Sequence, residues 1–414
     1  MWDASTGAEL QQLNGHIDFV NSVAFSYDGI HIVSGSDDQS VWVWDASTGA
    51  GLQQLNLNGH TSWVRSVAFS HNSTQIVSGA DDKSVRVWDA LTGAELHQLN
   101  GHTDEVNSVA FSYNSTFIVS GSDDKSVQVW DALTGAELHQ LNGHNHSIRS
   151  VAFSYDGIYI VSGSCDKSVR MWDASTGAEL QQFNGHTDWV KSVAFSHNGI
   201  YIVSGSDDKS VRVWDASTGA ELQVLTDHTQ KVNSVAFSHH DIYIVSGSDD
   251  KSVQIWDALT GAKLQQLNGH SGYVLSVAFS HDSTFILSGS SDNSVWVWNT
   301  LTGAALQQLN GHSDFVRSVA FSHDGTHMVS SSDDKSVRVW NRMHHGVLWT
   351  PTVNGWIKSL PDQDRLMWMP QGIREILYHP YTTLIISQKG YAHIDFEGCN
   401  LGIDWEKCYK PLLV

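Results

Sequence analysis

One dipeptide, Gly-His, recurs at a nearly constant interval, and this repetition limits the possible folds more than any other feature. The sixth copy has Asp-His instead, and the eight histidines are His16, His60, His102, His144, His186, His228, His270 and His312. The first interval is 44 residues, because Leu57 and Asn58 are inserted, and every later interval is 42. A Trp-Asp or Trp-Asn pair follows each histidine. A period of this length indicates a solenoid or a propeller rather than a series of unrelated domains.

Each copy of the repeat predicts four short strands. In the fifth copy, residues 193–196, 201–204, 211–214 and 221–225 are apolar or alternating, and clusters of turn-forming residues separate them. The repeats lack the 3.6-residue periodicity of an amphipathic helix, so a helical solenoid is excluded. Eight copies of four strands predict an all-β array closed into a ring, because closure removes exposed sheet edges.

Four polar residue types occupy matching places in every copy. In the fifth copy they are His186, Ser204, Asp208 and Trp214. With this pattern the chain resembles the WD-repeat (Trp-Asp repeat) β-propeller family over residues 2–341. The resemblance implies a buried tetrad whose hydrogen bonds run from Trp through Ser and His to Asp. The side-chain chemistry agrees, since an indole N–H only donates, a carboxylate only accepts, and a hydroxyl and an imidazole do both.

Most copies carry two adjacent Asp residues, six and seven positions before the Trp. Where one is replaced, by Cys165 or Ser291, the Asp six positions before the Trp is retained, as Asp166 or Asp292. We therefore interpret the nearer Asp as the tetrad member and the other as a tolerant turn residue. A Ser-His-Asp set also occurs in hydrolases. Eight identical copies argue against an active site, so the protein is not expected to be an enzyme.

The number of strands indicates eight blades. Eight inner triplets follow the Gly-His dipeptides, and eight outer-strand candidates follow Gly-Ala motifs. The first outer strand, at residues 8–13, precedes every Gly-His and is expected to close the ring on the copy that holds Trp340, as WD-repeat proteins commonly do. The alternative is seven blades, the commonest number in the family, which would leave one copy unpaired. Residues 1–341 are thus predicted to form an eight-bladed propeller.

The composition changes after residue 341. All five prolines and two of the three cysteines lie in residues 342–414, which are too aromatic for a disordered segment. Strands are predicted at residues 366–369, 383–386 and 391–396. Residues 346–349 could compete with the N-terminal strand for the last blade. We expect this C-terminal extension to pack on the propeller as a small appendage.

Charge and composition exclude several classes of function. The 23 Lys and Arg against 44 Asp and Glu give a net charge of −21, which argues against general binding to nucleic-acid phosphates. No apolar run approaches the roughly 20 residues of a membrane-spanning helix. The first residues lack the features of a signal peptide. Three cysteines are too few for a disulfide framework, so a cytoplasmic location is expected. Without a phosphate-binding loop or spaced metal ligands, no cofactor or metal is predicted. A monomer is expected.

The eight copies diverge at only a few positions, whereas Ser-Val-Ala-Phe-Ser is unchanged in all of them. Three positions yield candidate binding residues, and a fourth opens the second strand. The candidates three positions after the His are Phe19, Trp63, Trp189, Lys231, Tyr273 and Phe315. The candidates five positions after the His are Arg65, Arg149, Lys191 and Arg317. The candidates two positions before the Trp are Trp42, Arg86, Arg170, Arg212, Trp296 and Arg338.

In a WD-repeat blade, these three positions fall near the loops of one face, commonly called the top. Trp, Tyr, Phe and Arg are favoured in binding hot spots, whereas the Ala-Ser/Leu-Thr-Gly turn of the other face is nearly uniform. We therefore expect a non-catalytic scaffold that recognises a protein with acidic and apolar patches. The array is also similar to the repeat arrays of fungal NACHT-type receptors. A glycan-binding propeller is the alternative, although a repeated lectin would keep one pocket in every blade.

Overall fold

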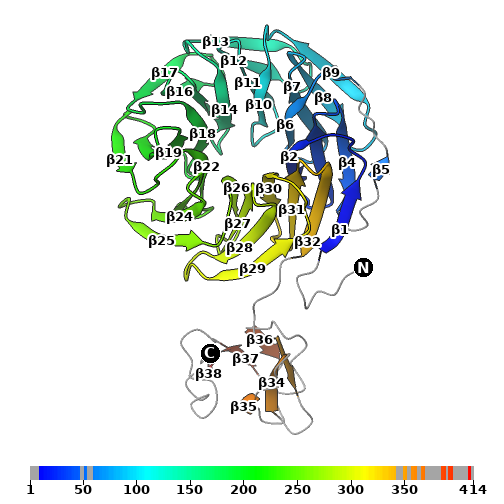
Figure 1. The fold of residues 1–414 in the computed structure, drawn as a ribbon, viewed down its shortest axis with the longest axis vertical. Coiled ribbons are helices and arrows are strands. Elements are labelled where there is room, and N and C mark those ends of the chain that lie inside the picture. The colour runs from blue at the N-terminus through cyan, green and yellow to red at the C-terminus, as the bar shows by residue number, and fades with distance from the viewer. Residues whose placement is uncertain are drawn as a thin grey trace. The chain divides into compact units, whose positions relative to one another are not determined.

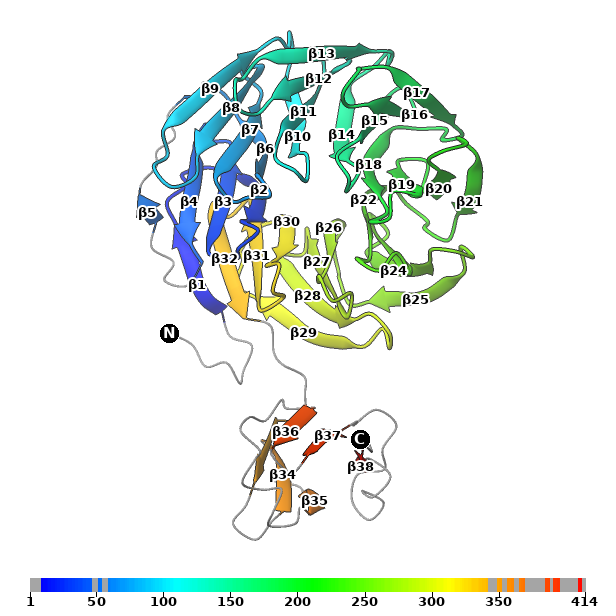
Figure 2. The same ribbon diagram turned by 180° about the vertical axis from the view of Figure 1, so that it is seen from behind.

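The computed structural model describes residues 9–46, 51–53 and 59–341 of the repeat region, and six strands between residues 348 and 411. The repeat region forms eight four-stranded antiparallel sheets, which follow one another around a common centre (Figure 1). Seen from behind, the same order of blades runs in the opposite sense (Figure 2). The predicted eight-bladed all-β propeller is confirmed, and seven blades is excluded.

Each blade contributes one strand to each of four concentric layers. The innermost strands are β2 (Val20–Phe25), β6 (Val64–Phe69), β10 (Val106–Phe111), β14 (Ile148–Phe153), β18 (Val190–Phe195), β22 (Val232–Phe237), β26 (Val274–Phe279) and β30 (Val316–Phe321). The second strands are β3 (His31–Ser36), β7 (Gln75–Ala80), β11 (Phe117–Ser122), β15 (Tyr159–Ser164), β19 (Tyr201–Ser206), β23 (Tyr243–Ser248), β27 (Phe285–Ser290) and β31 (His327–Ser332).

The third and fourth layers complete the blades. The third strands are β4 (Val41–Asp45), β8 (Ser84–Asp89), β12 (Ser126–Asp131), β16 (Ser168–Asp173), β20 (Val211–Asp215), β24 (Ser252–Asp257), β28 (Ser294–Asn299) and β32 (Ser336–Asn341). The outer strands are β1 (Glu9–Asn14), β5 (Gly51–Gln53), β9 (Glu95–Asn100), β13 (Glu137–Asn142), β17 (Glu179–Asn184), β21 (Glu221–Leu225), β25 (Lys263–Asn268) and β29 (Ala305–Asn310).

The residue pattern explains the order of the layers. Each second strand is buried over five consecutive residues, because neighbouring blades cover both of its faces. Most outer strands have one fully buried residue, such as Leu99 in β9, among exposed Glu and Gln side chains. Polar residues therefore face solvent at the circumference, where each sheet has its free edge.

The hydrophobic core is divided among the eight contacts between neighbouring blades. One cluster joins Val77, Val85 and Leu99 of one blade to Val106 and Trp130 of the next. Backbones approach closely here: a Cβ atom on Gly35 would lie 2.7 Å from a Val64 methyl group of the next blade. Glycine at this place in the second strand thus permits tight packing between blades.

The N-terminal strand closes the ring, as the strand balance predicted. Strand β1 pairs antiparallel with β32, with Leu13 opposite Val337, and Leu13 is buried at the contact with the first blade. The Lys335 ammonium also donates a hydrogen bond of 2.9 Å to the Ile17 carbonyl across the closure. The competing segment near residues 346–349 does not take this place, since its described part in β33 pairs with β34.

The chain divides into two compact units, Met1–Arg342 and Met343–Val414. The second unit has two small antiparallel sheets. They consist of β33 (Leu348–Pro351), β34 (Trp356–Leu360) and β35 (Arg365–Trp368), and of β36 (Leu384–Ser387), β37 (Gly390–Ile394) and β38 (Tyr409–Pro411). Cys399 and Cys408 lie outside the described residues, and packing of this unit on the ring stays a prediction. In the described segments we find no helix long and apolar enough to cross a membrane.

Candidate functional site

The predicted tetrad is present in every blade. In the fifth blade, the Trp214 indole donates a 2.9 Å hydrogen bond to the Ser204 hydroxyl, which lies 2.8 Å from His186 Nε2. His186 Nδ1 lies 2.8 Å from the Asp208 carboxylate. The same three contacts recur in the other seven blades. Each group in this relay donates to the next, which satisfies the buried donors in turn.

The tetrad carboxylate also organises the loops around it. Asp208 accepts hydrogen bonds from the backbone N–H groups of Thr187 and Ser210 and from the Ser210 hydroxyl. Burial alone would raise the pKa of Asp208, but the hydrogen bond and charge interaction with His186 hold this pKa well below its usual range. The carboxylate therefore stays ionised and ties the Gly-His loop to the turn that precedes the third strand.

The antiparallel order of strands gives the ring two distinct faces. We call the face with the Gly-His loops and the turns between second and third strands the tetrad face. The opposite face carries the turns between first and second strands and between third and fourth strands. The described residues show no group of three or more His, Cys, Asp or Glu side chains suited to a metal ion on either face.

The aromatic candidates three positions after the His lie exposed on the tetrad face. Each is the last residue before an innermost strand, and its side chain is between 37% and 51% exposed. We call this set the aromatic rim: Phe19, Trp63, Trp189, Tyr273 and Phe315. The equivalent place in the sixth blade holds Lys231, whose ammonium lies 2.9 Å from Asp207 of the preceding blade.

Cations from the next candidate position lie against this rim. The Arg65 guanidinium is 4.9 Å from the centre of the Trp63 ring, and the Lys191 ammonium is 5.6 Å from that of Trp189. The Arg149 guanidinium approaches Trp189 from the neighbouring blade at 5.9 Å. Arg317 lies 5.7 Å from the ring of Phe315 in the same way. These pairs are within the range of cation–π attraction and orient the rings before any partner arrives.

The same cations are held by the farther Asp of each Asp pair. Arg65 donates two hydrogen bonds of 2.7 Å to Asp81, and Arg317 binds Asp333 in the same two-point manner. In other blades an Asn takes the place of Arg, as in Asn233, which donates to Asp249 and to the Val274 carbonyl of the next blade. The farther Asp is therefore more than a tolerant turn residue, because it positions the candidate five places after the His.

The two blades without the farther Asp support this assignment. Where Ser291 replaces it, the residue five positions after the His is the apolar Leu275. Where Cys165 replaces it, Arg149 contacts the sulfur at 3.2 Å and reaches Asp123 of the preceding blade at 3.6 Å. Loss of the carboxylate thus accompanies loss or redirection of its partner.

The candidates two positions before the Trp lie near the Gly-His loops of the tetrad face, in the third strands rather than in the loops themselves. They lie in the third strands, against the Gly-His backbone: a Cβ on Gly59 would be 2.7 Å from the Arg86 guanidinium. Arg86 pairs with Glu95 of the outer strand at 2.5 Å. Arg170 and Arg212 pair equivalently with Glu179 and Glu221, Trp42 and Trp296 stack on Trp44 and Trp298, and Arg338 is buried. The Arg–Glu pairs and the Trp–Trp stacks lie within single blades, and the Nε atoms of Arg86, Arg170 and Arg212 are buried without a hydrogen-bond partner among the described residues.

One feature of the opposite face was missed in the sequence. The residue directly after each Ser-Val-Ala-Phe-Ser is Tyr or His, and the eight rings contact one another at interplanar angles of 35° to 51° around the centre of the propeller. We call this ring the collar: Tyr27, His71, Tyr113, Tyr155, His197, His239, His281 and His323. Neighbouring ring centres are 3.6 to 4.0 Å apart all the way round, including 4.0 Å between His323 and Tyr27 at the closure. The sequence did contain a signal for the collar, since only Tyr and His occur at this position in the eight copies.

Exposed aliphatic side chains surround the collar on the same face. They occupy the end of the first–second turn or the third–fourth turn, and they are 49% to 81% exposed. The set comprises Ile30, Leu91, Leu133, Ile158, Ile200, Ile242, Leu259 and Leu301. Both kinds of turn on this face thus carry exposed apolar side chains.

Comparison with known proteins agrees with the fold. Eight segments match the family "WD domain, G-beta repeat": residues 7–45, 51–89, 93–131, 135–173, 177–215, 219–257, 261–299 and 303–341. The crystal structure of the computationally designed Ika8 protein is 35% identical, with a TM-score of 0.73, and the match covers 81% of this chain and 100% of that one. No curated protein matches the sequence. Propellers of this kind commonly act as protein-interaction scaffolds and are generally non-catalytic. The chain belongs to the WD40 repeat family.

Proposed function

We propose that this protein is a non-catalytic interaction scaffold that binds a protein partner through the aromatic rim of the tetrad face. One observation carries this proposal: five of the eight equivalent positions hold exposed aromatic rings, three of them with a cation within 6 Å of the ring centre. Aromatic and Arg side chains dominate binding hot spots, because they offer large contact area at low entropic cost.

The rim favours a partner with apolar and acidic patches. Trp63 and Trp189 offer apolar contact area, and the cations beside them offer hydrogen-bond donors that Asp81 and Asp207 only partly occupy. An acidic group of the partner would complete these donors and orient the complex. The candidates of the third strands take no part, because their side chains are committed within the blades.

The wider setting belongs to the same proposal. The protein would act as a monomer in the cytoplasm, without nucleic acid, membrane or cofactor. The similarity of its array to those of fungal NACHT-type receptors would make it the recognition module of such a system. Divergence among otherwise near-identical copies supports this, since the rim position varies while Ser-Val-Ala-Phe-Ser does not.

The test begins with a pull-down using the intact chain, followed by binding titrations with the captured protein. Trp189→Ala is expected to weaken binding by roughly 2 kcal/mol or more if Trp189 is a hot spot. Ser217→Ala, in a third–fourth turn of the opposite face, serves as the control and should change affinity little. Equal affinities for the two variants, or a larger loss from Ser217→Ala, would contradict the proposal.

A further inference from the structure

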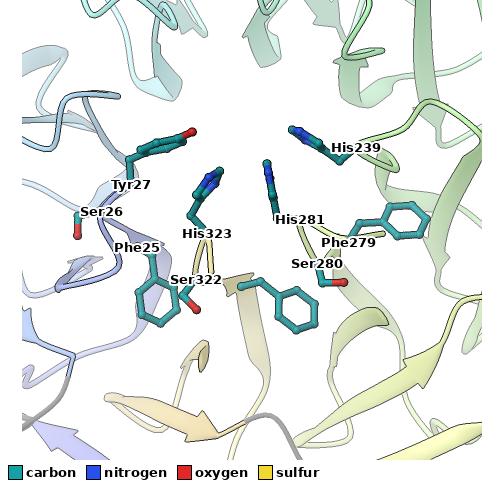
Figure 3. Close-up of a pocket in the computed structure, with 10 residues that line it drawn as sticks. Phe25, Ser26, Tyr27, His239, Phe279, Ser280, His281, Ser322 and His323 are labelled. Atoms are coloured by element: carbon teal, nitrogen blue, oxygen red, sulfur yellow. The ribbon is translucent and has the colours of Figure 1, made fainter. Parts of the chain in front are cut away.

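The collar borders a cavity of about 290 Å³, at the small end of the size range of ligand sites. Phe25, Phe279 and Phe321, together with the serines that follow them, line part of it, and their rings pack against the cores between blades. The remaining lining side chains belong to the collar: Tyr27, His239, His281 and His323. Figure 3 shows the tips of these four rings pointing toward the open space at the centre.

The imidazoles are the polar groups that this cavity offers to a ligand. The serine hydroxyls are occupied, since those of Ser280 and Ser322 donate to Asp282 and Asp324 at 2.6 Å. The imidazole nitrogens of His239 and His281, in contrast, make no hydrogen bond to any described residue. A neutral imidazole has one donor and one acceptor nitrogen, so each ring can accept a hydrogen bond from a ligand.

The charge around the cavity determines whether it attracts a cation or an anion. None of the eight turns between first and second strands contains Lys or Arg, and several carry Asp, including Asp28, Asp282 and Asp324. Burial lowers the pKa of His281, and burial with neighbouring imidazoles lowers the pKa of His239 to about 4. Near neutral pH the imidazoles of His239 and His281 are therefore uncharged acceptors in an acidic surrounding. Such a site attracts a cation and repels an anion.

We propose that the collar cavity binds a protonated amine carried on an apolar body. The apolar body lies against the rings of the collar that line the cavity, and the ammonium donates hydrogen bonds to imidazole nitrogens of the collar, with the turn carboxylates supplying long-range attraction. The same chemistry is available from a free aromatic amine or from a lysine side chain of a partner. This site lies on the opposite face from the aromatic rim and is independent of it.

Three matched probes test the chemistry by calorimetric titration of the whole chain: 2-phenylethylamine, 2-phenylethanol and 3-phenylpropionate. The amine is expected to bind at least about tenfold more tightly than the carboxylate, with the alcohol between them. A capped Leu-Lys-Leu peptide forms a second arm. Tighter binding of the peptide than of the amine assigns the site to a partner's lysine, and the reverse assigns it to a free amine. Equal binding of amine and carboxylate, or no binding of either amine source, overturns the proposal.

Variants locate the site. His281→Phe keeps an aromatic ring in the collar but removes both nitrogens, and should lower the amine affinity by about tenfold, as expected for loss of a charge-assisted hydrogen bond. His71→Phe is the matched control, because His71 belongs to the collar but does not line the cavity. Equal losses in the two variants, with unchanged thermal unfolding, would contradict the assignment.

Acidification supplies an independent check. His239 faces His197 and His281 on the two neighbouring turns and His240 on its own turn, and His323 also acts on it. Asp241 and Asp282 are the carboxylates of its own turn and of the next one. Lowering the pH from about 7 toward the pKa of His239 places positive charge on the collar, which repels the ammonium. The amine affinity should fall steadily over this range, and an affinity that rises on acidification would contradict the proposal.

Discussion

The two faces of the propeller are built from the same eight repeats, yet polar groups are used differently on each. On the tetrad face, buried relays such as Trp214–Ser204–His186 hold the loops in place, and exposed aromatic rings stand on this fixed base. On the opposite face, the Tyr and His rings of the collar contact one another, and aliphatic side chains around them face solvent. On the tetrad face the hydrogen bonds are directed into the blades, whereas on the opposite face tilted ring contacts between blades add to the hydrogen bonds within the turns.

The difference shows that variability between copies has two separate origins. Arg65 and most of its equivalents contact a side chain of the same repeat, so much of their divergence is absorbed within the blade. Trp63 and its equivalents vary without a fixed partner, which is the pattern expected of a recognition surface. Uniform turns on the opposite face, by contrast, coexist with a surface rich in exposed apolar and titratable groups.

The largest expected effect is a difference in stability between replacing two carboxylates of the same blade, one on each face. Asp208→Ala strands the buried His186 and should lower the free energy of unfolding by roughly 1–3 kcal/mol. Asp215→Ala removes a partly exposed acceptor for the N–H groups of Ser217 and Thr218, and should cost about 1 kcal/mol or less. Denaturant titration of both variants measures the order. If Asp215→Ala proved the more damaging, the tetrads would not be the main polar support of the ring.

As the pH falls, the two faces should lose their contributions to stability in different pH ranges. The pKa of Asp208 and of its seven equivalents is lowered in the folded protein, mainly by the His partner acting against burial. Their contribution to stability is complete above the ordinary Asp pKa of about 4 and is lost as the pH falls below it. Thermal unfolding below about pH 4 should therefore depend steeply on pH, and Asp208→Asn should reduce this slope.

The collar imidazoles should make the stability of the protein depend on pH in a higher range, between about 4 and 6.5. The pKa of His239 is lowered to about 4, and burial also lowers the pKa of His71 and His281. The unfolded chain takes up protons below about pH 6.5, whereas these folded imidazoles resist them, so stability falls between about 6.5 and 4. His239→Phe should flatten this range and leave the lower one unchanged. A variant that altered both ranges equally would show that the faces are not electrostatically separate.

The smallest expected effect concerns the compensated pairs of the tetrad face. A double-mutant cycle with Arg65→Met and Asp81→Ala should give a coupling energy below about 1 kcal/mol, because Arg65 is one-third exposed. The equivalent cycle at Leu275 and Ser291 should give none. A coupling of several kcal/mol would show that this pair supports the blade as strongly as a tetrad does.

Much of the fold followed from residues that repeat without change. The 42-residue period predicted the blades, the retained Asp of each Asp pair predicted the tetrad, and the early outer strand predicted the closure by β1. These features could be predicted from the sequence because each depends on a residue type that the geometry requires in every copy.

The candidate site was harder to predict from the sequence, because its binding residues depend on the direction in which each side chain points. Trp42 and Trp63 look equally suited to binding in the sequence, yet Trp42 stacks on Trp44 inside its blade while Trp63 is exposed. The collar position looked like an ordinary turn residue. Its meaning arises only when the ring closes, since His323 and Tyr27 meet across nearly the whole length of the repeat array.

The closure of the ring by β1 also poses a problem of assembly. Strand β1 has the sequence Glu-Leu-Gln-Gln-Leu-Asn, and β9, β13 and β17 differ from it at one residue each, so local chemistry cannot tell it which third strand to join. Its correct partner, β32, is the last of the eight third strands to be synthesised. The hydrogen bond from Lys335 to Ile17 joins residues 318 positions apart. The nascent chain must therefore keep β1 free while near-equivalent partners emerge. Only the curvature of the complete set of blades brings β1 to β32, so the geometry of the ring, and not the sequence of β1, selects its partner. Two unfinished chains can therefore exchange this strand at high concentration.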